Sequence, residues 1–149
     1  MDVTVNKTTN TLKFNFKALF NANRDFSSTD QNGNNMGDGA TNLFVRLVSG
    51  DPSALVDVIK TAGGFPKATD DDLFAAVDEL TADGEKVDEV MAEMKDELKN
   101  SGFFKKSIMM QKEGLETALP ILQAKEQTEE VAQQVAALER ILKLLNENL

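Results

Sequence analysis

Apolar and polar positions alternate at the start of the chain. Val3 and Val5 flank a threonine, and the polar run NKTTN leads to a second alternating series of Leu12, Phe14 and Phe16. A period of two residues with a polar connector is typical of a β-hairpin that has one apolar face. Because a lone hairpin is marginally stable in water, we expect this face to pack on helices.

From Phe16 onward the apolar period becomes that of a helix. A short helical pattern is followed by a loop rich in Gly, Asn, Ser and Asp, and four amphipathic segments come next. Asp51 is the predicted N-cap of the second segment, and Thr69 or Asp70 that of the third. The positions that fit the five helices are Phe16, Leu19, Phe20 and Asn23; Leu43, Phe44, Leu47 and Val48; the run from Asp51 to Gly63 and Gly64; Leu73, Phe74, Val77 and Leu80; and Val87, Val90, Met91, Met94 and Leu98.

The last third of the chain is also helical in pattern. One apolar stripe is interrupted by Pro120, which we expect to kink or break the helix because its ring clashes with the preceding turn. A final helix is predicted to begin near Thr128. The stripe of the first segment is Phe104, Ile108, Leu115, Leu119 and Leu122, and that of the second is Val131, Val135, Leu138, Leu142, Leu145 and Leu149.

The final stripe has the spacing of a coiled-coil seam. Its members alternate between four and three residues apart, which places them at a and d positions of a heptad. Two interpretations fit this pattern: the helix packs on its own domain, or the seam serves self-association or docking on another helix. For the second, the candidate residues are Val131, Val135, Leu138, Leu142 and Leu145.

Together these patterns predict a mainly α (α+β) fold. An N-terminal β-hairpin is expected to pack on a bundle of about five to seven helices. The 149 residues are enough for one domain with a sizeable core.

Composition then removes most catalytic chemistry. The chain has no Cys and no His, so it lacks thiol nucleophiles, thiolate metal ligands and the commonest general base at neutral pH. Only carboxylate, Lys or Ser/Thr chemistry remains. We therefore expect a protein that is not an enzyme and that uses no cofactor.

The net charge of −9 is uneven along the chain. Residues 51–100 carry fourteen acidic and five basic side chains. An acidic surface repels phosphate backbones, so we expect no nucleic-acid partner. The acidic surface is either a solvated helical surface or a complement to a basic partner.

The N-terminus lacks the pattern of a signal peptide, and no apolar run approaches the roughly 20 residues of a membrane span.

The stretch DQNGNNMGDGAT invites a test as a calcium loop, because oxygen-bearing side chains recur at Asp30, Asn32 and Asn34. An EF-hand needs Gly at position 6 and Glu at position 12 of its loop, but these positions are Asn35 and Thr41. We interpret the stretch as a Gly-rich connection.

Three consecutive aspartates at 70–72 are a second candidate for a metal site. They are explained by helix capping, since neighbouring helical residues do not converge on one ion.

Segment order carries more information than any single motif. LKFNFKALFNANRDF is followed by NGNNMGDGATNLFVRLVSGDPSALVDVIKTA, then ATDDDLFAAVDEL, then VDEVMAEMKDELKNSGFFKK. This succession resembles the tail assembly chaperones of long-tailed, siphovirus-type bacteriophages of Gram-positive bacteria. The resemblance covers roughly residues 3–106. We therefore expect a chaperone-like core at 1–106 and a helical extension at 107–149, which can belong to the same domain.

The resemblance implies a function in tail morphogenesis. Such chaperones bind the tape measure protein, keep it soluble and help recruit subunits of the major tail tube protein. The resemblance further implies that they work in the host cell cytoplasm as homo-oligomers and are absent from the mature virion. Two alternatives remain: an acidic helical regulatory protein that sequesters a basic partner, and a carboxylate-only metalloenzyme.

Overall fold

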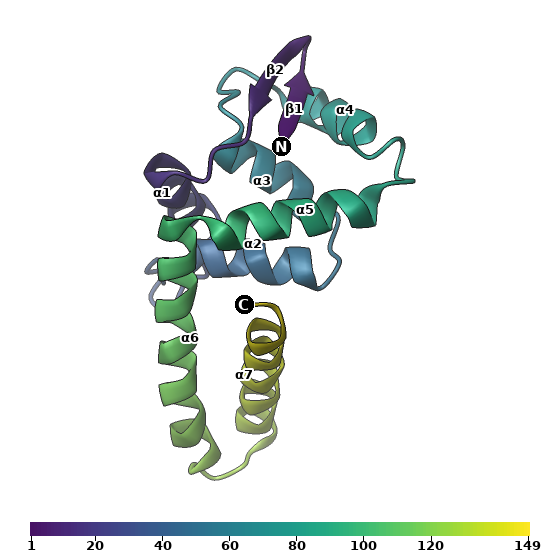
Figure 1. The fold of residues 1–149 in the computed structure, drawn as a ribbon. Helices are drawn as coiled ribbons and strands as arrows, with labels where there is room; N and C mark the ends of the chain where they lie inside the picture. Colours follow the sequence, from purple (N-terminus) through teal and green to yellow (C-terminus); the bar gives the residue numbers. More distant parts are fainter.

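A two-stranded hairpin and seven helices make up the computed structural model, which describes residues 1–149 (Figure 1). The strands are β1 (Asp2–Val5) and β2 (Thr8–Thr11). The helices are α1 (Phe16–Asp25), α2 (Gly39–Val48), α3 (Ala54–Ala62), α4 (Asp70–Leu80), α5 (Val87–Asn100), α6 (Gly102–Gln123) and α7 (Glu129–Asn148). The predicted mainly α fold with an N-terminal hairpin is confirmed.

The hairpin is tighter than the sequence pattern predicts. Its turn consists of Asn6 and Lys7, both with positive φ (49° and 66°), which is the backbone of a two-residue hairpin turn. This turn brings Thr8 directly opposite Val5, so the polar run TTNT pairs with β1. The predicted second strand through Leu12, Phe14 and Phe16 is therefore wrong, because pairing is complete before the apolar series begins.

The hairpin nevertheless packs on helices by one face. Val3 and Val5 are buried, and β1 contacts α4. The amino group of Met1 forms an ion pair with Glu97 of α5. On the other strand, the Asn10 side chain donates hydrogen bonds to backbone carbonyls in the connection after α3. The hairpin is thus held at three separate places.

Helix α1 buries its small residues rather than its large ones. Ala18 and Ala22 are inaccessible, whereas Phe16 and Phe20 are 61% and 58% exposed. The cause is a close approach of α1 to α2 at Gly39, where a Cβ atom would lie 1.9 Å from the carbonyl oxygen of Ala22. No large side chain fits between these backbones, so the aromatic residues of α1 face outward.

Helix α2 is the centre of the molecule. It contacts α1, α3, α5, α6 and α7, and its predicted stripe is buried except for Val48, which is partly exposed. The stripe predicted for α5 is likewise confirmed at Val90, Met91, Met94 and Leu98. The core also contains Leu12, Leu55, Val58, Ile59, Leu73, Phe104, Ile108 and Leu145.

The helix starts were predicted with mixed success. Thr69, one of the two residues predicted as the N-cap of α4, caps this helix in a capping box with Asp72. Helix α3 begins at Ala54 instead of after Asp51; the Asp51 carboxylate accepts hydrogen bonds from the Ser53 amide and hydroxyl in the turn before it. In α4 the predicted buried stripe is wrong at Phe74, which is 50% exposed, because the smaller Ala76 takes the buried position.

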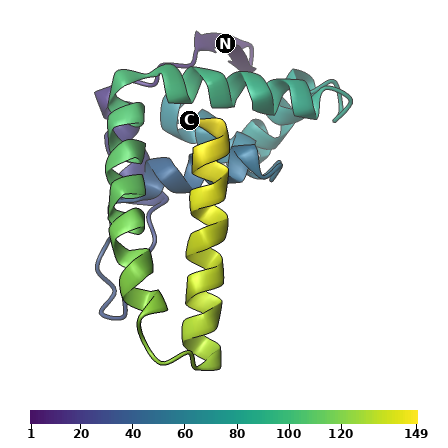
Figure 2. The ribbon, with the colours of Figure 1, turned by 60° about the horizontal axis from the view of Figure 1, so that its bottom comes forward.

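Helices α6 and α7 form a long antiparallel pair that extends from the rest of the molecule (Figures 1 and 2). The predicted break at Pro120 is wrong: α6 continues to Gln123. The proline sits in the last turn of α6. Because Pro120 has no amide hydrogen, the backbone carbonyl of Glu116 lacks its helical partner, and Glu116 is an exposed residue. Beyond the predicted boundary at residue 106, Ile108 and Leu145 share the core with the other helices.

Candidate binding surfaces

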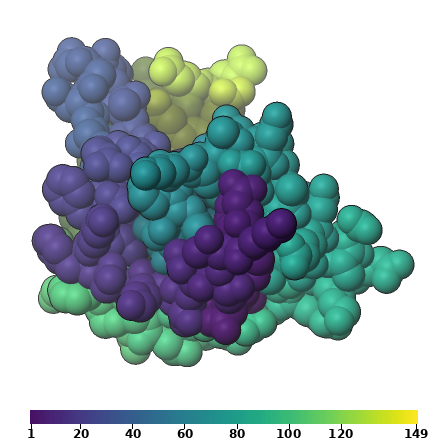
Figure 3. Space-filling model, turned by 90° about the horizontal axis from the view of Figure 1, so that it is seen from above, coloured from purple at the N-terminus to yellow at the C-terminus, as the bar shows by residue number.

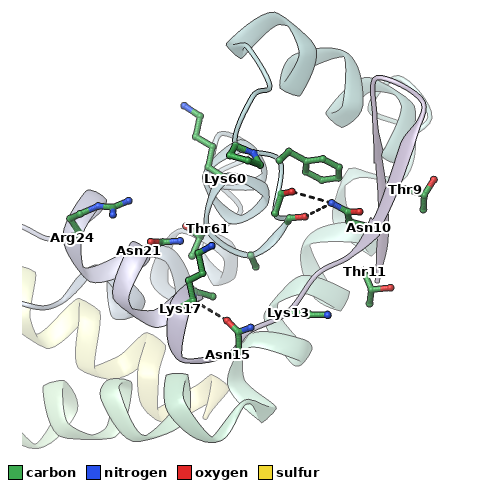
Figure 4. Close-up of a pocket in the computed structure, with 16 residues that line it drawn as sticks. Thr9, Asn10, Thr11, Lys13, Asn15, Lys17, Asn21, Arg24, Lys60 and Thr61 are labelled. Atoms are coloured by element: carbon green, nitrogen blue, oxygen red, sulfur yellow. Dashed lines mark hydrogen bonds between the residues drawn. The ribbon is translucent and has the colours of Figure 1, made fainter.

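A polar cleft opens between the hairpin, α1 and the end of α3 (Figure 4). Its volume is about 870 Å³, and none of its 16 lining residues is acidic. Four lining residues are cationic: Lys13, Lys17, Arg24 and Lys60. We call this feature the basic cleft. Four cations in one concavity stand out in a chain whose net charge is −9.

Local structure explains how the basic cleft is built. Lys17, Asn21 and Arg24 follow one another at helical spacing along one face of α1. Asn15 caps this helix by accepting a hydrogen bond from the Ala18 amide (3.0 Å). Across the cleft, Asn10 fixes β2 to the end of α3 by donating to the carbonyl oxygens of Gly63 (3.0 Å) and Gly64 (3.2 Å), as Figure 4 shows.

The four cations differ in their partners. Arg24 donates two hydrogen bonds to Asp25 (2.8 and 2.9 Å), and these hold the pKa of that carboxyl below its ordinary value. Lys60 lies 3.1 Å from an oxygen of Asp70. Lys13 and Lys17 form no ion pair with any residue of the chain. Two charges of the basic cleft are therefore free to meet an anionic partner.

An exposed apolar surface adjoins the basic cleft on α1, where the Arg24 guanidinium lies 5.9 Å from the centroid of the Phe20 ring. Phe16 contacts Phe103 of α6 in an edge-to-face arrangement with ring centroids 5.6 Å apart, yet Phe103 is still 50% exposed. Phe20 lies one turn after Phe16, and Met110 lies two turns after Phe103 on α6; they are 58% and 59% exposed. We call these four residues the aromatic surface. Because these exposed apolar side chains gather on two neighbouring helices, we treat them as a candidate binding surface.

The five seam residues of α7 are not equivalent. Leu142 and Leu145 are buried, and Leu145 is part of the central core. Val131, Val135 and Leu138 are only partly buried. The seam therefore faces its own protein at the end of α7 and becomes more accessible toward the connection with α6. On α6, Phe104 is likewise buried in the core, whereas Met110 is exposed.

The loop that resembles a calcium site is organised by its own hydrogen bonds. The Asp30 carboxylate accepts from the amides of Asn32 (2.8 Å) and Asn34 (2.9 Å) and from the Asn34 side chain (3.1 Å). These bonds, that of the Asn34 amide first, hold the pKa of Asp30 below its ordinary value. Asp30 thus acts as a turn-forming residue. No group of three or more metal-ligating side chains is arranged to hold an ion.

Together, the cleft and the aromatic surface are suited to binding other proteins. The sequence pattern of the family described as "Phage tail assembly chaperone protein, TAC" matches residues 2–113. The chain therefore belongs to the phage tail assembly chaperones. The match runs from β1 into α6 and includes both surfaces, while α7 lies outside it. Neither a curated protein nor a solved structure was found to match the chain.

Sequence reasoning predicted neither the basic cleft nor the exposure of Phe16 and Phe20. The basic cleft had one local signal, the Lys17, Asn21 and Arg24 spacing on α1, but its other walls come from separate segments. No signal in the sequence indicated that Phe16 and Phe20 are exposed, because apolar residues at helical spacing normally indicate a core.

None of the helices has the length and apolar character required to cross a bilayer.

Proposed function

We propose that this chaperone binds the tape measure protein, keeps it soluble in the host cytoplasm and helps recruit subunits of the major tail tube protein. Membership of the tail assembly chaperone family is the observation that carries the proposal. A family of this kind implies a non-enzymatic role in assembly, and the expected partners are tail proteins.

The aromatic surface supports the proposal physically. A long tape measure protein exposes apolar helical stripes until the tube covers it, and such stripes bind in apolar grooves and faces of other helices. Phe16 and Phe103 offer rigid aromatic contacts, which often dominate binding energy. Several moderate contacts, repeated along a long target, allow both occupancy and release when tube subunits arrive.

The test is co-expression of the chain with its cognate tape measure protein. We expect the tape measure protein to become soluble and to co-purify at high salt, because apolar contacts persist when charges are screened. The double variant Phe16→Gln with Phe103→Gln should reduce the co-purified amount about tenfold, as expected for the loss of two aromatic contacts.

Phe74→Gln is the matched control, because Phe74 is 50% exposed on α4, away from the aromatic surface. It should leave capture unchanged. Equal losses in the control and the double variant would place binding elsewhere, and an insoluble, unbound tape measure protein would contradict the proposed function.

We also propose that the accessible part of the α7 seam contributes to self-association or tape measure binding. Val131, Val135 and Leu138 are its partly exposed members, whereas Leu142 is buried. Changing Val131 and Val135 to Lys should leave the chain folded but reduce its self-association at high salt or its capture of the tape measure protein. Light scattering and the co-expression assay measure the two effects. If neither changes, the whole seam serves only the internal packing of α7.

One observation favours the alternative of an acidic regulator that sequesters a basic partner. The acidic residues are concentrated in α4 and α5 and in the turn between them. Binding through these charges should weaken steeply with salt, whereas chaperone binding through apolar contacts should not. The high-salt wash in the co-expression experiment therefore separates the two functions.

A further inference from the structure

All of the excess negative charge of the chain lies in one segment. Residues 70–97, which include α4 and most of α5, carry twelve acidic and two basic side chains, a net charge of −10. The remaining residues carry thirteen acidic and fourteen basic side chains, a net charge of +1. The chain is therefore electrically divided rather than uniformly acidic.

The exposed tip of the acidic segment has no partner within the chain. We call residues 78–89, the end of α4 through the start of α5, the acidic turn. Its six carboxylates are exposed, and none forms an ion pair. They belong to Asp78, Glu79, Asp83, Glu85, Asp88 and Glu89.

The acidic turn has a shape that can enter a cleft. Ala82, Asp83 and Gly84 have positive φ angles of 50°, 56° and 93°, which fold the chain back sharply between the two helices. The Gly84 amide donates to the Thr81 hydroxyl (3.1 Å), which fixes the turn. Figure 3 shows the corresponding teal atoms projecting from the edge of the molecule.

The acidic turn and the basic cleft lie at opposite ends of the protein. In Figures 1 and 2, α1, which forms one wall of the cleft, is at the left, and the connection between α4 and α5 is at the far right. The acidic turn cannot reach the cleft of its own chain. Lys13 and Lys17 of the cleft are exposed and unpaired, so both surfaces are open to another molecule.

We propose that the basic cleft of one copy receives the acidic turn of a second copy. Because the two surfaces differ, two copies joined in this way still have one free cleft and one free turn between them. The contact therefore repeats head to tail and builds rings or filaments. The charge complementarity is encoded within this one chain and needs no other protein. The proposal therefore stands or falls independently of tape measure binding.

Sedimentation velocity of the purified full chain tests the proposal. At about 20 mM NaCl the average mass should rise with concentration above the 16.3 kDa of one copy. At about 0.5 M NaCl, where the Debye length is about 4 Å, the charge-dependent part of the association should be lost and the average mass should fall. The direction of this change distinguishes the proposed contact from other causes of association. Salt reduces the general repulsion between acidic chains and preserves apolar contacts, so association from those causes would persist or increase at high salt.

Charge reversal on each side identifies the surfaces. Lys13→Glu with Lys17→Glu should weaken association at least about tenfold, as should Glu85→Lys with Asp88→Lys, because each places like charges opposite one another. Mixing the two variants should restore association, since the intact turn of one variant meets the intact cleft of the other and the reversed turn meets the reversed cleft. Lys105→Glu with Lys106→Glu is the control: it makes the same charge change at exposed positions of α6 outside the cleft and should associate as the wild type does.

Three results would overturn the proposal. The first is a wild-type chain that stays at 16.3 kDa at every concentration and salt level, which would leave the cleft to an acidic segment of another protein. The second is equal weakening by the cleft variant and the α6 control. The third is a mixture of the reversed variants that associates no better than either alone. Because a misfolded variant would also fail to associate in the mixture, the circular dichroism of each variant must first match that of the wild type.

Discussion

Replacing Gly39 with alanine is expected to lower the free energy of unfolding by about 3 kcal/mol. The added Cβ would lie 1.9 Å from the carbonyl oxygen of Ala22 and 2.8 Å from the Cα of Asn23. Both atoms belong to the backbone of α1, so no side-chain rotation relieves the clash, and α1 must move away from α2. Urea unfolding followed by circular dichroism measures the change.

Gly114 provides the matched control for this substitution. It lies within α6, and a Cβ there meets no atom within 4 Å. Gly114→Ala should raise the free energy of unfolding by about 0.5–1 kcal/mol, because alanine favours the helix. Equal effects of the two substitutions would contradict the close approach of α1 and α2. The contrast also gives a physical reason for the last glycine of the NGNNMGDG stretch.

Leu145→Ala is expected to destabilise the protein by about 2–5 kcal/mol. Leu145 is fully buried and belongs to the central core, although it lies on the last helix. The substitution removes apolar contacts and leaves a cavity that the surrounding helices fill only in part. Urea unfolding monitored by both helix content and hydrodynamic radius should show one cooperative transition at a lower midpoint.

Val131→Ala is the control, because Val131 is only partly buried at the opposite end of α7. Its effect should stay below about 1 kcal/mol. If Leu145→Ala also stayed within that limit, or if α7 unfolded in a separate transition, the last helix would not be part of the same cooperative unit as α2. The pair of variants therefore tests whether the predicted extension at 107–149 folds with the rest.

Local signals made much of the fold predictable. The capping box at Thr69, the apolar stripe of α5 and the start of α7 at Thr128 each depend on residues close in sequence. The second strand was misplaced because a two-residue turn with positive φ occurs at Asn6 and Lys7 without the glycine that usually signals it. The error is local and concerns which residues pair.

The candidate sites were less predictable because they depend on tertiary arrangement. The basic cleft combines residues of β2, α1 and α3, and only the α1 residues share a helical face that the sequence reveals. Phe16 and Phe20 look like core residues, but the approach of Gly39 to Ala22 leaves no room for them inside. A distant glycine thus decides whether two aromatic side chains form a core or a surface.

The uneven burial of α7 has a dynamic consequence. Leu142 and Leu145 hold the end of the helix, where Lys99 also donates a hydrogen bond to the carbonyl of Asn148 (3.0 Å). Val131 and Val135, next to the connection with α6, are held by fewer buried contacts. We therefore expect local opening of α7 to begin at the connection with α6 and to proceed along the helix, while its C-terminal end stays attached. The length of apolar helix that becomes accessible to a partner would then depend on how far this opening extends.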